Sequence, residues 1–172
     1  MFAPFSVAGQ PSGHLAGAGF VSSQAVRLFE HAVHVARRKR LVARLHGRLR
    51  RLEQLDSARA ELHLTGRHDE GVRTVPLDCI QGSLDGAGSF DSEFYPLDYR
   101  AEKRWVQVAT AILQGKALPP VQLIALGDRY FVVDGHHRIS VAHILKNTHI
   151  DAEIIVWEVS GQGEGGGCSL RR

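Results

Sequence analysis

The chain has 172 residues, of which 44% are hydrophobic and 23% are charged. These proportions are typical of a soluble globular protein, and the length suits one domain with appended segments. No apolar run approaches the roughly 18 residues that a membrane-spanning helix needs, so we expect no membrane partner. The two cysteines, Cys79 and Cys168, have neither the number of a disulfide framework nor the spacing of a zinc site, which favours a reducing cytoplasm.

The net charge of +3 conceals an uneven distribution along the chain. Residues 1–70 hold 11 Lys and Arg against 6 Asp and Glu, a balance of +5. Residues 71–172 hold 10 against 12, a balance of −2, and the two halves together give the 21 and 18 of the whole chain. The basic character therefore belongs to the first part of the chain.

The first part of the chain is predicted to be a tail, a helix and a connector. Residues 1–21 are rich in Gly, Ala, Ser and Pro, lack the basic start and compact apolar core of a signal peptide, and are expected to be disordered. Residues 22–55 are predicted to form a helix, which Gly47 breaks or kinks. Its apolar stripe consists of Leu41, Leu45, Leu49, Leu52 and Leu55. Residues 56–73 are expected to form a connector.

Basic side chains cover the rest of this predicted helix. They are Arg37, Arg38, Lys39, Arg40, Arg44, Arg48, Arg50 and Arg51. Such a surface can meet nucleic-acid phosphates, with the run 37–40 and Arg44 as the candidate contacts. No aromatic residue lies among them for base stacking, which favours instead a solvated helix whose leucines pack on the domain or on a partner, a second copy of the chain included.

From Thr74 the pattern changes and predicts a small α+β domain that ends at Val159. Strands are expected in four segments, 74–82, 121–126, 129–133 and 151–159. Helices are expected in 97–113 and 136–145. Gly127-Asp128 joins two of the strands as a hairpin, and Gly115 and Asn147 end the two helices. Residues 160–172 are expected to be a flexible tail.

The sequence Asp134-Gly135-His136-His137-Arg138 lies where a predicted strand gives way to a predicted helix. The first N–H groups of a helix are unpaired, and the helix dipole favours an anion there. Gly135 permits a sharp turn and the close approach of a ligand. Arg138 can fork onto a phosphate. His136 and His137 are donors whose charge changes near neutral pH. These residue types predict a phosphate site.

Asp134 indicates which chemistry accompanies the phosphate. A carboxylate repels a phosphate unless a divalent cation lies between them or the carboxylate handles a proton, so Asp134 points to magnesium or general-base catalysis. A helix end contributes only about 0.3–1 kcal/mol towards an exposed anion, whereas micromolar affinity needs about 8 kcal/mol. The metal, Arg138 and contacts to the rest of a nucleotide would have to provide the difference.

The residues of this joint allow two other interpretations. In a purely structural one, Asp134 caps the helix, Arg138 pairs with a surface carboxylate and the histidines are solvated. A zinc site is disfavoured, because adjacent residues on a helix point about 100° apart and no fourth ligand accompanies His136, His137 and His143.

Residues 74–159 resemble the ParB/sulfiredoxin superfamily, most strongly in the hairpin followed by Asp-Gly-His-His-Arg. The resemblance implies a small mixed sheet with helices, preceded here by the basic N-terminal helix. In ParB proteins the matching joint is a Gly-Glu-Arg-Arg motif that binds the phosphates of cytidine triphosphate with magnesium, and Gly135 and Arg138 match it. In free serine kinases of this fold the joint has the same five residues as 134–138 and holds nucleotide phosphates. Small bacterial proteins of the ParB-like nuclease type also resemble this pattern.

The same resemblance sets limits on the expected activity. The kinase-type relatives use an upstream glutamate as base, for which Glu93 is the nearest candidate and Asp91 the next. The cysteine of sulfiredoxins falls on His136, so sulfinic-acid reduction is not expected. ParB partition proteins continue into a helix-turn-helix domain, whereas a Gly-rich tail follows here, which argues against sequence-specific centromere binding.

The sequence therefore predicts a cytoplasmic, nucleotide-binding α+β protein, with ATP, ADP or CTP and magnesium as ligands and phosphoryl transfer or nucleotide hydrolysis as the chemistry. The catalytic candidates are Asp134, His136, His137 and Glu93. The phosphate-binding candidates are Gly135, His136, His137 and Arg138, and Asp134 is the metal candidate. One alternative is a DNA-associated ParB-like module, of a partitioning or nuclease-like kind, that uses the basic helix. Another is a degenerate fold that binds a protein through the leucine stripe.

Overall fold

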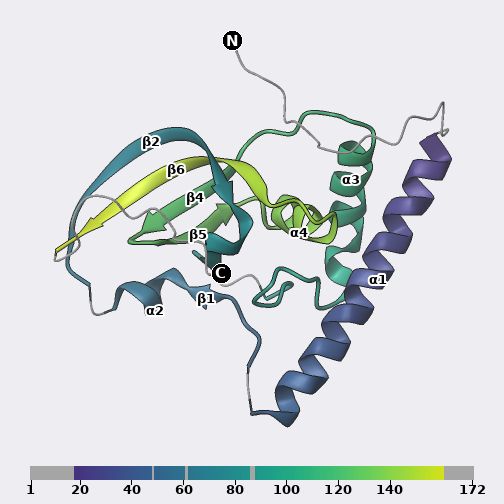
Figure 1. Cartoon of the computed structure of the whole chain (residues 1–172), viewed down its shortest axis with the longest axis horizontal. Helices are drawn as coiled ribbons and strands as arrows, with labels where there is room; N and C mark the ends of the chain where they lie inside the picture. The colour runs from purple at the N-terminus through teal and green to yellow at the C-terminus, as the bar shows by residue number, and fades with distance from the viewer. Residues whose placement is uncertain (1–17, 48, 61, 86–87, 161–172) are drawn as a thin grey trace.

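The computed structural model describes residues 18–47, 49–60, 62–85 and 88–160 (Figure 1). Of the tails expected in 1–21 and 160–172, residues 1–17 and 161–172 lie outside these ranges. No helix in the described ranges has the length and apolar character that crossing a bilayer requires.

The first helix, α1 (Ala18–Leu45), is displaced from the prediction at both ends. It begins at Ala18, so residues 18–21, which were expected to be disordered, are helical. It ends before Gly47, whose φ of 65° lies in the left-handed region that glycine adopts without strain. The helix was predicted to continue to residue 55, and that continuation is wrong. Gly47, which was expected to break or kink the helix, follows its end.

The buried face of α1 is not the predicted leucine stripe. It consists of Ala25, Phe29, Ala32, Val33 and Ala36. Leu41, Leu45 and Leu49 are exposed, and Leu52 and Leu55 are buried but lie beyond the helix. Small residues allow α1 to pack closely on the next long helix, whereas its last turns extend past that helix into solvent (Figure 1).

Six strands form one mixed sheet in the order β1-β3-β5-β4-β6-β2. Their bounds are β1 (Glu53–Gln54), β2 (Leu64–Pro76), β3 (Ile80–Ser83), β4 (Val121–Leu126), β5 (Arg129–Asp134) and β6 (His149–Val159). β4 and β5 are antiparallel, so the hairpin predicted at Gly127-Asp128 is confirmed. β3 runs parallel to β5, and β6 runs parallel to β4.

The connector predicted for 56–73 is wrong from Leu64 onward, because β2 occupies that segment. β2 pairs with β6 along its whole length and forms an edge of the sheet, and most of its side chains are exposed. An edge strand with solvated side chains has no apolar alternation that could reveal it. The strand predicted for 74–82 is in fact the end of β2, the 3-10 turn η1 (Leu77–Cys79) and β3.

Three further helices complete the α+β architecture that the sequence predicted. They are α2 (Leu55–Arg59), α3 (Glu102–Leu113), which follows the 3-10 turn η2 (Tyr99–Ala101), and α4 (His136–Ile144). α3 and α4 confirm the two helices expected after Thr74. Gly115 ends α3 with a φ of 70°, as predicted, whereas after α4 the left-handed residue is Lys146, with a φ of 60°, and not Asn147.

The sheet is covered on both faces. Alternate residues of β4 belong to different clusters: Leu123 packs with the residues under α3 and α4, and Ile124 packs with Phe131 and Trp157. Between the helices, the buried indole N–H of Trp105 donates a 2.9 Å hydrogen bond to Ser140 Oγ. This bond joins α3 to α4 and so fixes the helix whose first turn contains the candidate site.

Candidate functional site

The predicted joint lies at the end of β5 and the start of α4. Gly135 is the N-cap residue, with φ 107° and ψ 16°, and no side chain caps the helix. A Cβ at this position would lie 2.5 Å from Cγ1 of Val121, which no real contact allows. Glycine is therefore required here, and the proposal that Asp134 caps the helix is wrong. No capping side chain therefore accepts a hydrogen bond from the first amide groups of α4.

Arg138 is held by the backbone that leads into β4. Its Nη1 donates hydrogen bonds to the carbonyl oxygens of Pro119, at 2.5 Å, and Pro120, at 2.7 Å, while Nη2 lies 2.5 Å from Asp134 Oδ2. The side chain is only 14% exposed. Most of the guanidinium thus holds the Pro-Pro segment against the joint, and the predicted contact with a phosphate would have to use its remaining N–H groups.

Asp134 is the outermost residue of the joint. Its side chain is 61% exposed and pairs with Arg138 through one carboxylate oxygen. Among the residues that the structure describes, no group of three His, Cys, Asp or Glu side chains could hold a metal ion. Magnesium commonly binds through one or two carboxylates, with phosphate oxygens and water completing its shell. The exposed carboxylate of Asp134 could be such a single protein ligand.

His136 lies on the sheet side of the joint. Its Nε2 is 2.8 Å from the hydroxyl oxygen of buried Ser83 on β3, and its ring stacks on Phe90 at a centroid distance of 6.2 Å. Burial lowers the pKa of His136, although the carboxylates of Asp134 and Asp85 oppose the shift. The imidazole is therefore neutral at pH 7, with one ring nitrogen already engaged.

His137 meets the other side of the same aromatic ring. It contacts Phe90 edge-on, at 5.2 Å and 88°. Burial, followed by the positive charge of Arg104 and the neighbouring His136, lowers the pKa of His137 to about 4. Neither histidine is a solvated surface group, so that part of the structural interpretation is wrong.

The loop over the two histidines is built around Asp91. Its fully buried carboxylate accepts hydrogen bonds from the backbone N–H of Glu93, at 3.0 Å, and of Tyr95, at 2.9 Å. Arg50 adds an ion pair through Nε at 3.2 Å. These bonds hold Phe90 in place against the histidines. Asp91, the second choice for the catalytic base, is therefore a structural residue.

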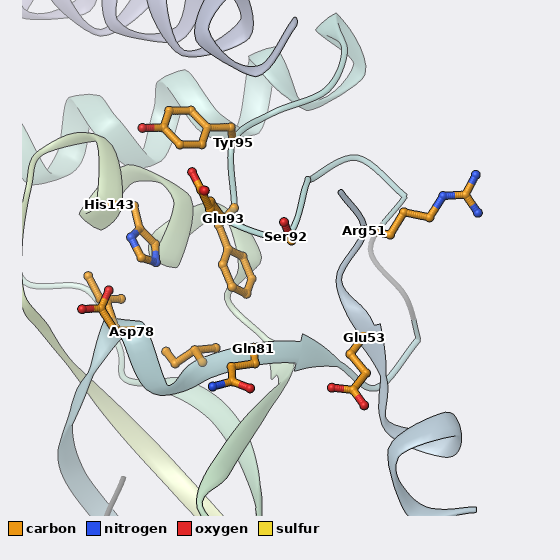
Figure 2. A pocket seen from close by; sticks show the side chains of 11 residues that line it. Arg51, Glu53, Asp78, Gln81, Ser92, Glu93, Tyr95 and His143 are labelled. Atoms are coloured by element: carbon orange, nitrogen blue, oxygen red, sulfur yellow. The ribbon is translucent and has the colours of Figure 1, made fainter. Parts of the chain in front are cut away.

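Glu93 lies at a pocket of about 520 Å³ beside α4 (Figure 2). Its carboxylate forms ion pairs with Lys39 and with Arg50, the latter at 2.8 Å. Burial alone would raise the pKa of Glu93, but the hydrogen bonds from these two cations outweigh it and keep the pKa below its ordinary value. A carboxylate held in this way is a weak base, because a general base works best with a pKa near the operating pH.

His143, from the third turn of α4, shares this pocket with Glu93 and Asp78 (Figure 2). Its ring stacks on Phe94, with centroids 5.9 Å apart and planes inclined by 9°. Burial lowers its pKa, and its Nε2 is buried without a hydrogen-bond partner in the described part of the chain. Phe94 also lies 6.4 Å from the ring of His136, so the same buried ring contacts both histidines.

The basic residues of α1 do not form one array. Lys39 is bound to Glu93, and the guanidinium of Arg37 lies 5.7 Å from the ring centre of Tyr99. Arg38, Arg40 and Arg44 are exposed, and within the described ranges they form no ion pair. Of the five candidate nucleic-acid contacts, these three are engaged by no other described side chain.

Several residues of the site were not found from the sequence. Phe90, Phe94, Ser83 and Arg50 come from three separate segments, and only the fold brings them to the joint. His143 was considered only as a zinc ligand. A local signal existed for Asp91 alone, since an Asp that binds amides two and four residues later makes a tight turn.

No family model and no curated protein sequence matches this chain. Among solved structures, the crystal structure of sulfiredoxin from Arabidopsis thaliana is similar, with a TM-score of 0.37 and 20% sequence identity. The similarity covers 48% of this chain and 82% of the sulfiredoxin chain.

Proposed function

We propose that this protein binds the phosphate groups of a nucleotide at the start of α4. The observation that carries the proposal is a helix start without a side-chain cap, placed beside two imidazoles that are neutral at pH 7. The backbone amides of the first turn of α4 would donate to phosphate oxygens, and Gly135 leaves room for their approach. His136 and His137 would act as neutral hydrogen-bond donors.

Magnesium would be held between Asp134 and the nucleotide. The exposed carboxylate of Asp134 has one oxygen outside its pair with Arg138, and a magnesium ion there would take its other ligands from phosphate and water. Bound in this way, the ion would neutralise the repulsion between Asp134 and the phosphates.

Phosphoryl transfer or nucleotide hydrolysis is the chemistry proposed for such a complex, because it depends on positioning and charge neutralisation. Glu93 remains the candidate for orienting an acceptor hydroxyl or water, since it lines a pocket whose Phe94 ring also contacts His136. Because its pKa is below the ordinary value, the carboxylate is a weak base, and its proposed role is to orient the nucleophile, not to remove its proton.

The test is calorimetric titration of the full chain with ATP, ADP, CTP and GTP, with and without magnesium. Micromolar binding of one nucleotide should weaken at least tenfold in His137→Ala, and Asp134→Asn should abolish the effect of magnesium. His31→Ala, at an exposed position on α1, is the control and should bind as wild type does. Absence of binding at millimolar nucleotide would refute the proposal.

A DNA-associated role is the second candidate, favoured by the exposed and unpaired Arg38, Arg40 and Arg44. If these three residues contact duplex phosphates, the logarithm of the binding constant should fall with the logarithm of the salt concentration with a slope of about −3. Fluorescence anisotropy on a labelled duplex measures this slope. A binding constant that does not change with salt, or in Arg40→Glu, would eliminate this role.

A further inference from the structure

The last turns of α1 carry a second apolar surface that faces away from the domain. Leu41 is 63% exposed, Val42 54%, Leu45 79% and, just past the helix, Leu49 82%. Leu45 follows the buried Ala36 by nine positions, and at 100° per residue this places it on the opposite side of the helix. These leucines therefore cannot be core residues of this domain, and four large apolar side chains gathered in water mark an interaction surface.

Part of this surface is concave. A groove of about 670 Å³ runs between the end of α1 and the segment that follows it. Its apolar lining includes Val35, Val42, Ala43 and Leu49, and Arg38 and His46 also line it. A ridge of side chains from another helix fits such a groove, with anchors repeating every three or four residues.

The charge around the groove selects the partner. Arg38, Lys39 and Arg50 line the groove, and Arg38 is exposed without a carboxylate partner in the described parts of the chain. By contrast, Lys39 pairs with Glu93, and Arg50 pairs with both Glu93 and Asp91, so these two cations are balanced by two carboxylates. The uncompensated charge beside the apolar groove is therefore positive, and complementary potentials favour a negative partner.

We propose that this surface docks an acidic amphipathic helix of another protein. A second copy of the chain fits less well, because it would bring the same uncompensated positive charge, that of Arg38, against itself. Duplex DNA would leave the leucines in water. A lipid surface is flat and does not fill a groove. The proposal does not depend on nucleotide binding at α4.

The experiment measures binding of a fluorescein-labelled peptide of three Leu-Glu-Glu-Leu-Leu-Glu-Glu repeats to the full chain by fluorescence anisotropy. Binding should weaken at least tenfold in Leu45→Asp and in Arg38→Glu, each of which changes an exposed side chain. Phe20→Asp is the matched control: Phe20 is 60% exposed at the other end of the same helix, and this variant should bind as wild type does. Circular dichroism should show all three variants folded.

Four results would overturn the proposal. The first is absence of binding, or equal binding of a scrambled peptide or of the peptide with Lys in place of Glu. The second is an equal loss in Phe20→Asp. The third is a dimer of the chain alone, seen by sedimentation velocity and dissociated by Leu45→Asp, which would assign the surface to a second copy. The fourth is that the chain binds phosphatidylglycerol vesicles or duplex DNA more tightly than it binds the peptide, and that this binding is lost in Leu45→Asp.

Discussion

Arg138 Nη2 and Asp134 Oδ2 lie 2.5 Å apart across the joint between β5 and α4. The sequence predicted that both residues contact a ligand, and in the structure they form an ion pair with each other. Because Arg138 also bonds to the carbonyls of Pro119 and Pro120, the pair connects three segments of backbone. A magnesium ion that arrived with a nucleotide would bind the other oxygen of Asp134 and share this carboxylate with the guanidinium.

This geometry predicts a structural cost for losing Arg138. Arg138→Ala should lower the free energy of unfolding by about 1–3 kcal/mol, because two proline carbonyls lose their donor. Asp134→Asn should cost less than about 1 kcal/mol, since the Asp134 side chain is 61% exposed and its ion pair is screened by water. Urea denaturation measures both. Equal costs for the two variants would contradict the clamp assigned to Arg138.

Gly135 should tolerate no side chain. Gly135→Ala should cost about 3 kcal/mol or more, because it adds both a disfavoured backbone conformation and overlap with Val121. Gly115→Ala is the matched control: Gly115 also has a positive φ, of 70°, but nothing lies within 4 Å of an added Cβ, so only about 1 kcal/mol is expected. Thermal and urea unfolding should rank them in this order. The reverse ranking would show that the packing against Val121 is wrong.

The bond between Trp105 and Ser140 should be important for the position of α4. Ser140→Ala leaves the buried indole N–H without an acceptor and should cost about 1–3 kcal/mol. Thr110→Val on α3 is the comparison. The Thr110 hydroxyl is buried and has no partner within the described residues, so its removal should be neutral or stabilising. A larger loss in Thr110→Val than in Ser140→Ala would reverse this assignment.

Acid should weaken the fold partly through His137. The pKa of His137 in the folded state is about 4, against an ordinary value of 6.5. Between these values the unfolded chain binds the proton that the folded chain refuses, so this contribution to stability is complete above pH 6.5 and is lost as the pH falls towards 4. His137→Gln should make the fall in urea midpoint between pH 6.5 and 4 shallower than in wild type. An unchanged slope would mean that His137 is already solvated.

The second part of the chain could be predicted well from its sequence because its signals are local. Gly127-Asp128 specifies a tight hairpin, and Gly115 and Gly135 mark the ends of elements at which a positive φ is required. The joint at 134–138 was placed correctly between a strand and a helix for the same reason. Each of these features depends on a few consecutive residues and on backbone geometry alone.

The first part could not be predicted in the same way. β2 has few buried side chains and is held in place by its backbone pairing with β6. Such pairing leaves no pattern in the local sequence. In α1 the leucines suggested the wrong buried face, because close packing on α3 selects Ala25, Ala32 and Ala36. The aromatic walls of the candidate site were missed because Phe90 and Phe94 reach the histidines only through the turn around Asp91.

The order of the strands has a consequence for how the chain is made. β6 is the last strand to be synthesised, yet it lies between β4 and β2. A growing chain on the ribosome can form the β4–β5 hairpin early, but β2 has no partner until residues 149–159 have emerged from the exit tunnel. During that interval the long unpaired strand is exposed to other nascent chains, and its charged residues, from Arg67 to Arg73, keep it from pairing with them.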